Sequence, residues 1–261
     1  MKQLLQQLGF EKWGKSYRYD VGTRKIFLDF KAKNKKQVEL LHHKYPTIAK
    51  EVLAFYSQYN GLAFTLQGRS NNLEEAKICS LNELFDKFKE EAIPFPDNLD
   101  IVAYNNDFDL QESYLKKEDP FFRKLYAPEE FEEFDTLKEV QEANIIRRAK
   151  KLAPIFGYDD DIVIDFQATN ENTYQIYLLS GRSGTGQGLY PMDIDFQEFL
   201  NYFLLFGFVG HWYTAFIPLS SFTKKELRVK SMIKELEKYF RASPIHQEPL
   251  NTLISKLNKF Q

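Results

Sequence analysis

Short runs in which apolar and polar residues alternate predict several β-strands. The clearest are residues 162–166 and 174–179, which are rich in Ile, Val, Tyr and Leu and flank the polar turn sequence ATNEN. Tyr17 and Tyr19 alternate with polar residues before Gly22, and an extended pattern resumes afterwards, which predicts an N-terminal hairpin. The predicted strands cover residues 17–30 (as a hairpin), 62–66, 99–104, 162–166, 174–179 and 211–219.

Other segments place apolar residues three and four positions apart, which predicts one apolar face of a helix. In residues 46–59 the signals agree, because Pro46 suits the first helical position and Asn60-Gly61 supplies a left-handed stop. The residue pairs with capping-box spacing are Ser80 and Glu83, Asp195 and Glu198, and Thr223 and Glu226. The predicted helices cover residues 34–45, 46–59, 81–88, 137–152, 195–204, 223–240 and 249–257, the last beginning at Pro249.

Composition places the chain among ordinary soluble proteins. Of its 261 residues 43% are hydrophobic and 16% aromatic, which is ample for a core, although aromatic residues are also common anchors in protein interfaces. The formal net charge of −2 gives no sign of nucleic-acid binding. A single cysteine, Cys79, excludes an intrachain disulfide, and no apolar run reaches membrane-spanning length. We therefore expect a soluble cytoplasmic protein.

The motifs that could carry chemistry do not match known ligand patterns. The glycine-rich residues 181–188, GRSGTGQG, lack the Lys and Ser or Thr of a phosphate-binding loop, and we interpret them as a loop at the end of a hairpin. Residues 105–110 resemble a calcium loop but lack its glycine and its final glutamate. The four histidines have no zinc-binding spacing, and His211 beside Trp212 is expected to be packed or hydrogen-bonded. We predict no metal and no cofactor.

Two groups of carboxylates leave alternatives open. Asp159, Asp160 and Asp161 could bind a cation, but three consecutive aspartates beside a strand are more often a solvated turn. Asp165 could pair with Asp193 or Asp195 as an acid and a base, and sequence alone does not place these side chains in space. An enzyme is therefore not excluded, although no motif favours one.

The order of four segments resembles the SUKH superfamily, which includes bacterial immunity proteins and fungal regulators of cell-wall assembly. The segments are PTIAKEVLAFYSQYNGLAF, LAPIFGYDDDIVIDF, TYQIYLLSGR and DIDFQEFL. In that family a helix ending in Asn-Gly, here Asn60-Gly61, enters a strand; a later strand, here within Ala153–Phe166, pairs with the next; and a helix, here Asp195–Leu200, closes the unit. The resemblance covers roughly residues 45–207.

The resemblance implies an α+β fold with a central, mainly antiparallel sheet packed against helices. Residues 45–221 would form this domain, with an insertion around 105–135. Residues 1–44 would add an N-terminal hairpin and helix, and residues 222–261 would add C-terminal helices packed on the same domain.

The resemblance further implies a function in binding rather than catalysis, most simply an immunity protein that neutralises a bacterial toxin. An acidic partner-binding surface with aromatic anchors would complement a basic toxin. The residues predicted for it are Glu129, Glu130, Phe131, Glu132, Glu133 and Phe134, together with Asp159, Asp160 and Asp161. The alternatives are plain solvated surface at these residues, an intracellular scaffold or regulator of the cell-wall-assembly type, and an enzyme that uses Asp165, Asp193 and Asp195.

Overall fold

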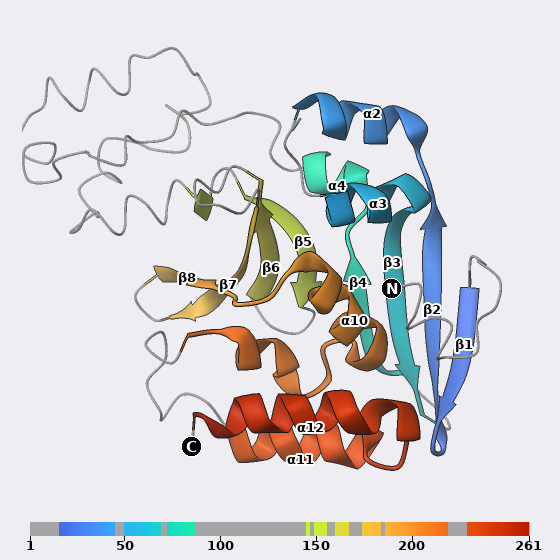
Figure 1. Ribbon diagram of the computed structural model, residues 1–261, viewed down its shortest axis with the longest axis vertical. Helices are drawn as coiled ribbons and strands as arrows, with labels where there is room; N and C mark the ends of the chain where they lie inside the picture. The colour runs from blue at the N-terminus through green and yellow to red at the C-terminus, as the bar shows by residue number, and fades with distance from the viewer. Residues whose placement is uncertain are drawn as a thin grey trace, which may run out of the picture. The chain divides into compact units, whose positions relative to one another are not determined.

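The computed structural model describes residues 16–44, 50–68, 72–86, 145–146, 149–155, 160–166, 174–183, 186–218 and 229–260 (Figure 1). The chain divides into two compact units, of which the first contains Met1–Leu84 and Lys151–Gln261 and the second contains Phe85–Lys150. Apart from the end of α4 and the first residue of β5, the elements below belong to the first unit.

Four antiparallel strands form the first sheet, in the order β1-β2-β3-β4. They are β1 Ser16–Val21, β2 Arg24–Ala32, β3 Tyr59–Gln67 and β4 Asn72–Ile78. The predicted N-terminal hairpin is confirmed, and Gly22 makes its turn at φ 60°. Because β2 pairs along most of β3, this hairpin is part of the main sheet. Strand β4 was not predicted, since its sequence NLEEAKI is too polar at one end to give a clear alternation.

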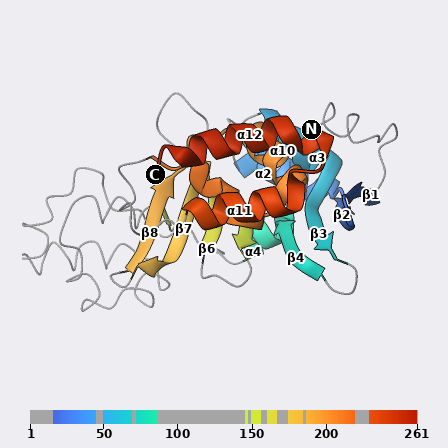
Figure 2. The ribbon, with the colours of Figure 1, turned by 90° about the horizontal axis from the view of Figure 1, so that it is seen from below.

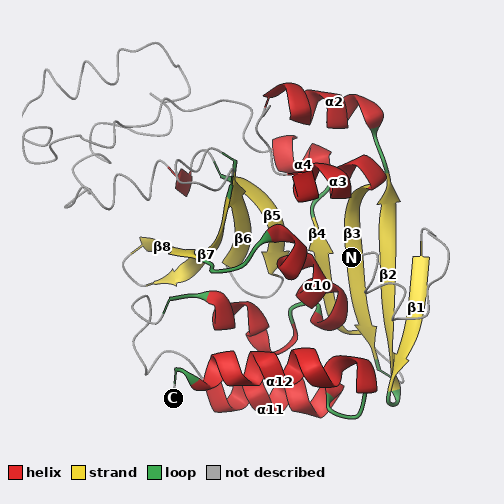
Figure 3. Ribbon diagram, in the orientation of Figure 1, coloured by secondary structure: helices red, strands yellow, loops and turns green. Residues whose placement is uncertain are grey.

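The second sheet has the order β5-β6-β7-β8 (Figure 3). Its strands are β5 Lys150–Ile155, β6 Asp160–Asp165, β7 Gln175–Ser183 and β8 Gly186–Pro191. The antiparallel pair of β6 and β7 confirms the prediction from the two apolar runs. The glycine-rich residues are not a loop throughout, because most of them extend β7 and begin β8, with Ser183 opposite Gly186.

The two sheets meet where β4 ends. The Cys79 N–H donates to the Leu152 carbonyl oxygen of β5 at 2.8 Å. The predicted α+β class is confirmed, but the sheet is divided into two antiparallel four-stranded sheets that join at this hydrogen bond.

Helices pack on the sheets mainly through aromatic side chains. The helices are α2 Lys35–Lys44, α3 Lys50–Gln58, α4 Leu81–Asp86, α10 Phe196–Phe206, η1 Val209–Phe216 (a 3₁₀-helix), α11 Val229–Phe240 and α12 Pro244–Asn258. Helix α10 buries eight of its eleven residues. Its Phe196 meets Phe55 of α3 and its Phe203 meets Phe64 of β3, with ring centroids 5.8 and 6.0 Å apart. Helix α10 is therefore the central core element of the first unit.

Residues 209–216 correct the prediction of a strand over HWYTAFIPL, because they form the 3₁₀-helix η1. Gly207, Gly210 and His211 all have positive φ, so the backbone turns tightly instead of extending. Seven of the eight residues of η1 are buried. An apolar run buried on all sides has no alternation by which a strand could be distinguished from a helix.

The C-terminal helices correct two predicted boundaries. Helix α12 begins at Pro244 and continues through Pro249, which was expected to start it. Figure 2 shows α12 beside α11. The predicted helix over residues 137–152 ends too late, because Lys150, Lys151 and Leu152 belong to β5.

Candidate functional site

The residues predicted to bind a partner lie only in part within the described structure. Residues 129–134 and Asp159 fall outside the described residues. Asp160 and Asp161 are the first residues of β6, so their assignment to a solvated turn is wrong. Asp160 is buried and accepts a hydrogen bond from the Ser180 hydroxyl at 2.7 Å. Their part in partner binding stays a prediction.

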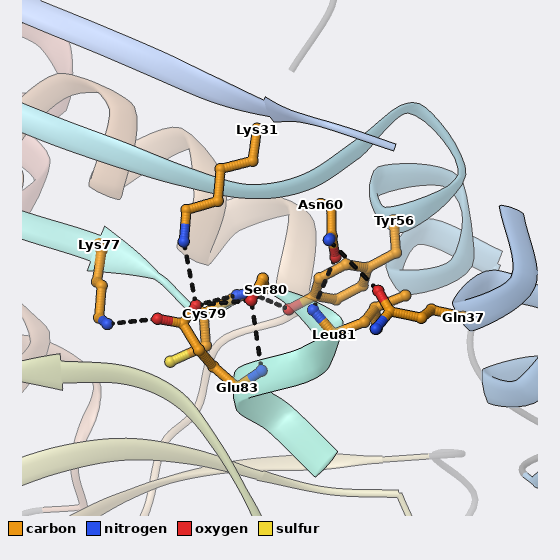
Figure 4. A network of polar contacts seen from close by, with 9 residues as sticks. All are labelled: Lys31, Gln37, Tyr56, Asn60, Lys77, Cys79, Ser80, Leu81 and Glu83. Atoms are coloured by element: carbon orange, nitrogen blue, oxygen red, sulfur yellow. Dashed lines mark hydrogen bonds and ion pairs between the residues drawn. The ribbon is translucent and has the colours of Figure 1, made fainter. Parts of the chain in front are cut away.

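Asp161 belongs to a group of charges at the junction of the two sheets. Its carboxylate pairs with Lys151 Nζ of β5 at 2.5 Å. On the other side of the junction, Glu83 of α4 pairs with Lys77 Nζ at 2.6 Å and with Lys31 Nζ at 3.2 Å (Figure 4). We name these five residues, Lys31, Lys77, Glu83, Lys151 and Asp161, the seam cluster.

Glu83 is the best-defined member of the seam cluster because it also caps α4. It accepts from the Ser80 N–H at 2.7 Å and the Ser80 hydroxyl at 2.8 Å, while the Ser80 oxygen accepts from the Glu83 N–H at 3.3 Å. The predicted capping box is confirmed. Partial burial raises the pKa of Glu83, but the hydrogen bonds from Lys77, Ser80 and Lys31 outweigh it and lower the pKa to about 2. Glu83 is therefore a carboxylate at neutral pH.

Polar side chains beside the seam cluster hold its supporting elements together (Figure 4). Asn60 accepts from the Leu81 N–H at 2.8 Å and so fixes the start of α4, and Tyr56 donates to the Cys79 carbonyl oxygen at 3.0 Å (Figure 4). The expected left-handed stop is at Gly61, with φ +102°, but it lies inside β3 rather than after a helix end. A Cβ at Gly61 would lie 2.9 Å from the Ile78 oxygen, so β3 and β4 approach closely only with glycine here.

The side chains of the seam cluster are both paired and accessible to solvent. Its side chains are between 20% and 47% exposed, so they are ordered by ion pairs and still reach solvent. Cys79 lies beside the cluster, but burial, with Glu83 nearby, raises the pKa of its thiol to about 11. A buried thiol of this kind is a poor nucleophile at neutral pH.

A second polar centre lies at the start of α10, where the sequence had predicted only the cap formed by Asp195 and Glu198. The Tyr174 hydroxyl donates to Glu51 of α3 at 2.9 Å and accepts from the Phe196 N–H at 2.8 Å. The Asp195 carboxylate accepts from the Glu198 N–H at 2.6 Å, as the predicted cap requires. One buried hydroxyl thus joins α3, the start of β7 and the first turn of α10.

The other end of α10 is held by hydrogen-bond donors from three elements. Tyr19 of β1 donates to the Leu204 oxygen at 2.9 Å, His246 of α12 contacts the Leu205 oxygen at 3.0 Å, and Trp212 of η1 donates to the Gly207 oxygen at 2.6 Å. Because an oxygen is the partner, His246 Nε2 carries the proton. These donors satisfy carbonyl groups that a helix end leaves unpaired.

Glu74 of β4 completes this end of α10. Its carboxyl accepts from the Phe208 N–H, and the Val209 N–H contributes a further hydrogen bond. Burial raises the pKa of Glu74 to about 8 against the effect of these donors, and the nearby Glu235 raises it further. Sequence reasoning missed Glu74 because β4 itself was not predicted.

The aspartates of the enzyme alternative have different surroundings. Asp165 is buried on β6, opposite Gln175 of β7. Asp193 and Asp195 are exposed between β8 and α10, and both add to the effect of burial, which raises the pKa of Glu198. Asp193 and Asp195 therefore lie close to Glu198.

The described residues contain neither a candidate metal site nor a helix that could cross a membrane. In the part of the chain that the structure describes, no group of three or more His, Cys, Asp or Glu side chains could hold a metal ion. Among the described helices, none is long and apolar enough to cross a membrane. His211 is hydrogen-bonded to the Tyr213 hydroxyl at 2.7 Å, as expected.

Comparison with known proteins gave no match: no family model, no curated protein and no solved structure is similar to this chain.

Proposed function

We propose that this chain is a SUKH-type immunity protein, which neutralises a polymorphic toxin in the cytoplasm by binding it directly and without catalysis. The proposal rests on the order of four sequence segments and on the contacts between three of them in the structure.

The observation that carries the proposal is the position of Tyr174. This residue opens the segment TYQIYLLSGR, and its hydroxyl binds Glu51 of the segment PTIAKEVLAFYSQYNGLAF and Phe196 of the segment DIDFQEFL. The remaining segment, LAPIFGYDDDIVIDF, begins at Leu152. The Leu152 carbonyl oxygen accepts the hydrogen bond that joins the two sheets. The four segments thus share one scaffold, which is what a common family pattern requires.

The buried polar groups of this scaffold support a role in binding. Tyr56, Tyr174 and His246 each connect separate elements through their hydrogen bonds. A rigid scaffold of this kind presents a surface with little loss of conformational entropy on association. In this proposal the residues that bind the toxin are those predicted from the sequence: Glu129, Glu130, Phe131, Glu132, Glu133 and Phe134, together with Asp159, Asp160 and Asp161.

A protection assay tests the proposal. The protein is co-expressed in bacteria with each toxin domain encoded beside its gene, and growth is measured. We expect full protection against one toxin domain. Protection against none of them would refute the immunity function.

Variants of the acidic residues then test the partner surface. Glu129, Glu130, Glu132 and Glu133 are changed to Gln, and the matched control changes Asp20, Asp29, Glu39 and Glu248, all exposed, to Asn or Gln. We expect the first variant to lose protection and the control to keep it, with both at wild-type abundance. Equal protection by both variants would refute the assignment of the surface and leave the immunity function standing.

A further inference from the structure

A ridge of basic side chains runs along the exposed side of α11. Lys230, Lys234 and Lys238 are exposed and stand four residues apart, and the side chain of Arg241 is 68% exposed. Four residues of α-helix rise about 6 Å and turn only about 40° past a full turn, so the four cations lie along one side of the helix. We name these four residues the α11 ridge.

The carboxylates of α11 do not neutralise the ridge. Glu237 pairs with Arg241 at 3.0 Å, and this ion pair does not include any of the three lysines. Glu235 is exposed and raises the pKa of Glu74, and among the described residues it forms no ion pair with a lysine of the ridge. In the described part of the chain no ion pair involves Lys230 or Lys234, so their ammonium groups remain open to a partner.

An aromatic residue lies at the end of the ridge between two cations. The Arg24 guanidinium of β2 lies 4.5 Å from the centroid of the Tyr239 ring, and Lys238 Nζ lies 4.9 Å from it. These contacts hold Arg24 and Tyr239 in place on a surface formed by two elements far apart in sequence. Tyr and Arg are the residue types that most often dominate binding energy in protein interfaces.

The chemistry of the ridge favours an acidic protein over a nucleic acid. A ridge of four cations, one of them paired to Glu237, is small for a phosphate backbone, and the chain has a net charge of −2. Carboxylates at four-residue spacing on a facing helix would repeat at the same distance of about 6 Å and meet the lysines one by one.

We propose that the α11 ridge, with Arg24 and Tyr239, is a docking surface for an acidic helix of a protein partner. It is separate from the seam cluster and does not depend on the immunity function.

Fluorescence anisotropy tests this proposal. The probe is a fluorescein-labelled helical peptide with glutamates at four-residue spacing, and its control has glutamine at those positions. The test variant is Lys230→Glu, Lys234→Glu and Lys238→Glu. The matched variant of equal charge change is Lys33→Glu, Lys35→Glu and Lys36→Glu, at exposed positions at and before the start of α2. Circular dichroism verifies that both variants fold.

We expect the wild-type protein to bind the glutamate peptide at low ionic strength and to bind it more weakly at about 0.15 M salt. Reversal of the ridge should weaken binding by about tenfold or more, because three charge pairs are replaced by repulsions, whereas the control variant should lose less than about threefold.

Four results would overturn the proposal: no binding of the glutamate peptide by the wild type, equal binding of the glutamine peptide, equal loss in the two lysine variants, or tighter binding of single-stranded DNA than of the glutamate peptide. The last result would assign the ridge to nucleic acid instead.

Discussion

Glu74 makes the stability of the protein depend on pH. Its pKa in the folded protein is about 8, against 4.5 for an ordinary glutamate, because burial and Glu235 disfavour the charge. The folded state therefore keeps a proton that the unfolded chain releases above pH 4.5. The stabilisation is fully present below that pH and is lost as the pH rises toward 8.

The magnitude follows from the difference in pKa. A shift from 4.5 to about 8 corresponds to up to about 5 kcal/mol between the two ends of this range. Glu74→Gln keeps an oxygen that can accept from the Phe208 N–H and cannot ionise. We expect this variant to match the wild type within about 1 kcal/mol at pH 5 and to be more stable by several kcal/mol at pH 9.

The assay is chemical denaturation at a series of pH values from 5 to 9, followed by tryptophan fluorescence. Trp212 is a suitable reporter because it donates to the Gly207 oxygen, next to Phe208. Glu248→Gln, at an exposed position of α12, is the control and should follow the wild-type profile. If the profiles of Glu74→Gln and the wild type stay parallel over the whole range, Glu74 takes up no proton on folding and the reasoning is refuted.

Three further predictions concern the scaffold. Tyr174→Phe should lower the free energy of unfolding by about 2–3 kcal/mol, because it leaves the buried Phe196 N–H unpaired and removes the hydrogen bond to Glu51. Tyr202→Phe should cost less than about 0.5 kcal/mol in the same denaturation series, because the Tyr202 hydroxyl makes no hydrogen bond within the described part of the chain. Gly61→Ala should lower the free energy of unfolding by about 2 kcal/mol or more, and Gly22→Ala by about 1 kcal/mol. Both glycines have positive φ, but only Gly61 faces a backbone oxygen. Equal losses of stability in thermal melts of the two variants would count against this explanation. Burial lowers the pKa of His246 to about 4, so stability should fall as the pH drops from 6.5 toward 4, and an NMR titration of its ring with a midpoint above 6 would contradict this.

Local sequence signals predicted local structure well. Ser80 with Glu83 and Asp195 with Glu198 mark helix starts because a cap is formed within four residues. Gly22 marks the hairpin for the same reason, since the turn depends on its own backbone conformation. Such elements need no knowledge of the rest of the chain.

Elements defined by distant contacts were not predictable in this way. Strand β4 has Glu74 on its buried side, and this polar residue is accommodated only because Phe208 and Val209 donate to it from 134 or more residues away. The glycines at the start of β8 were interpreted as a loop from the sequence. They form a strand because they pair with β7. Pro249 lies inside α12, whose first turn is fixed instead by His246 and its hydrogen bond to Leu205.

In the candidate site, too, local features were predictable from the sequence, and features that depend on distant contacts were not. Asp161 was singled out from the sequence, but its ion pair with Lys151 could be predicted only if β5 and β6 were known to be neighbours in the sheet. Tyr174 gave no sequence signal, because its two partners lie 123 and 22 residues away. A tyrosine at the start of a strand is otherwise an ordinary core residue.

Direct binding to a toxin is the central claim, and stoichiometric inhibition tests it most directly. The purified protein is titrated into a toxin domain encoded beside its gene while the activity of the toxin is measured, and the complex is sized by light scattering. We predict a one-to-one complex and complete loss of toxin activity at equimolar protein. Full toxin activity in a large excess of the protein, for every such toxin domain, would contradict the account.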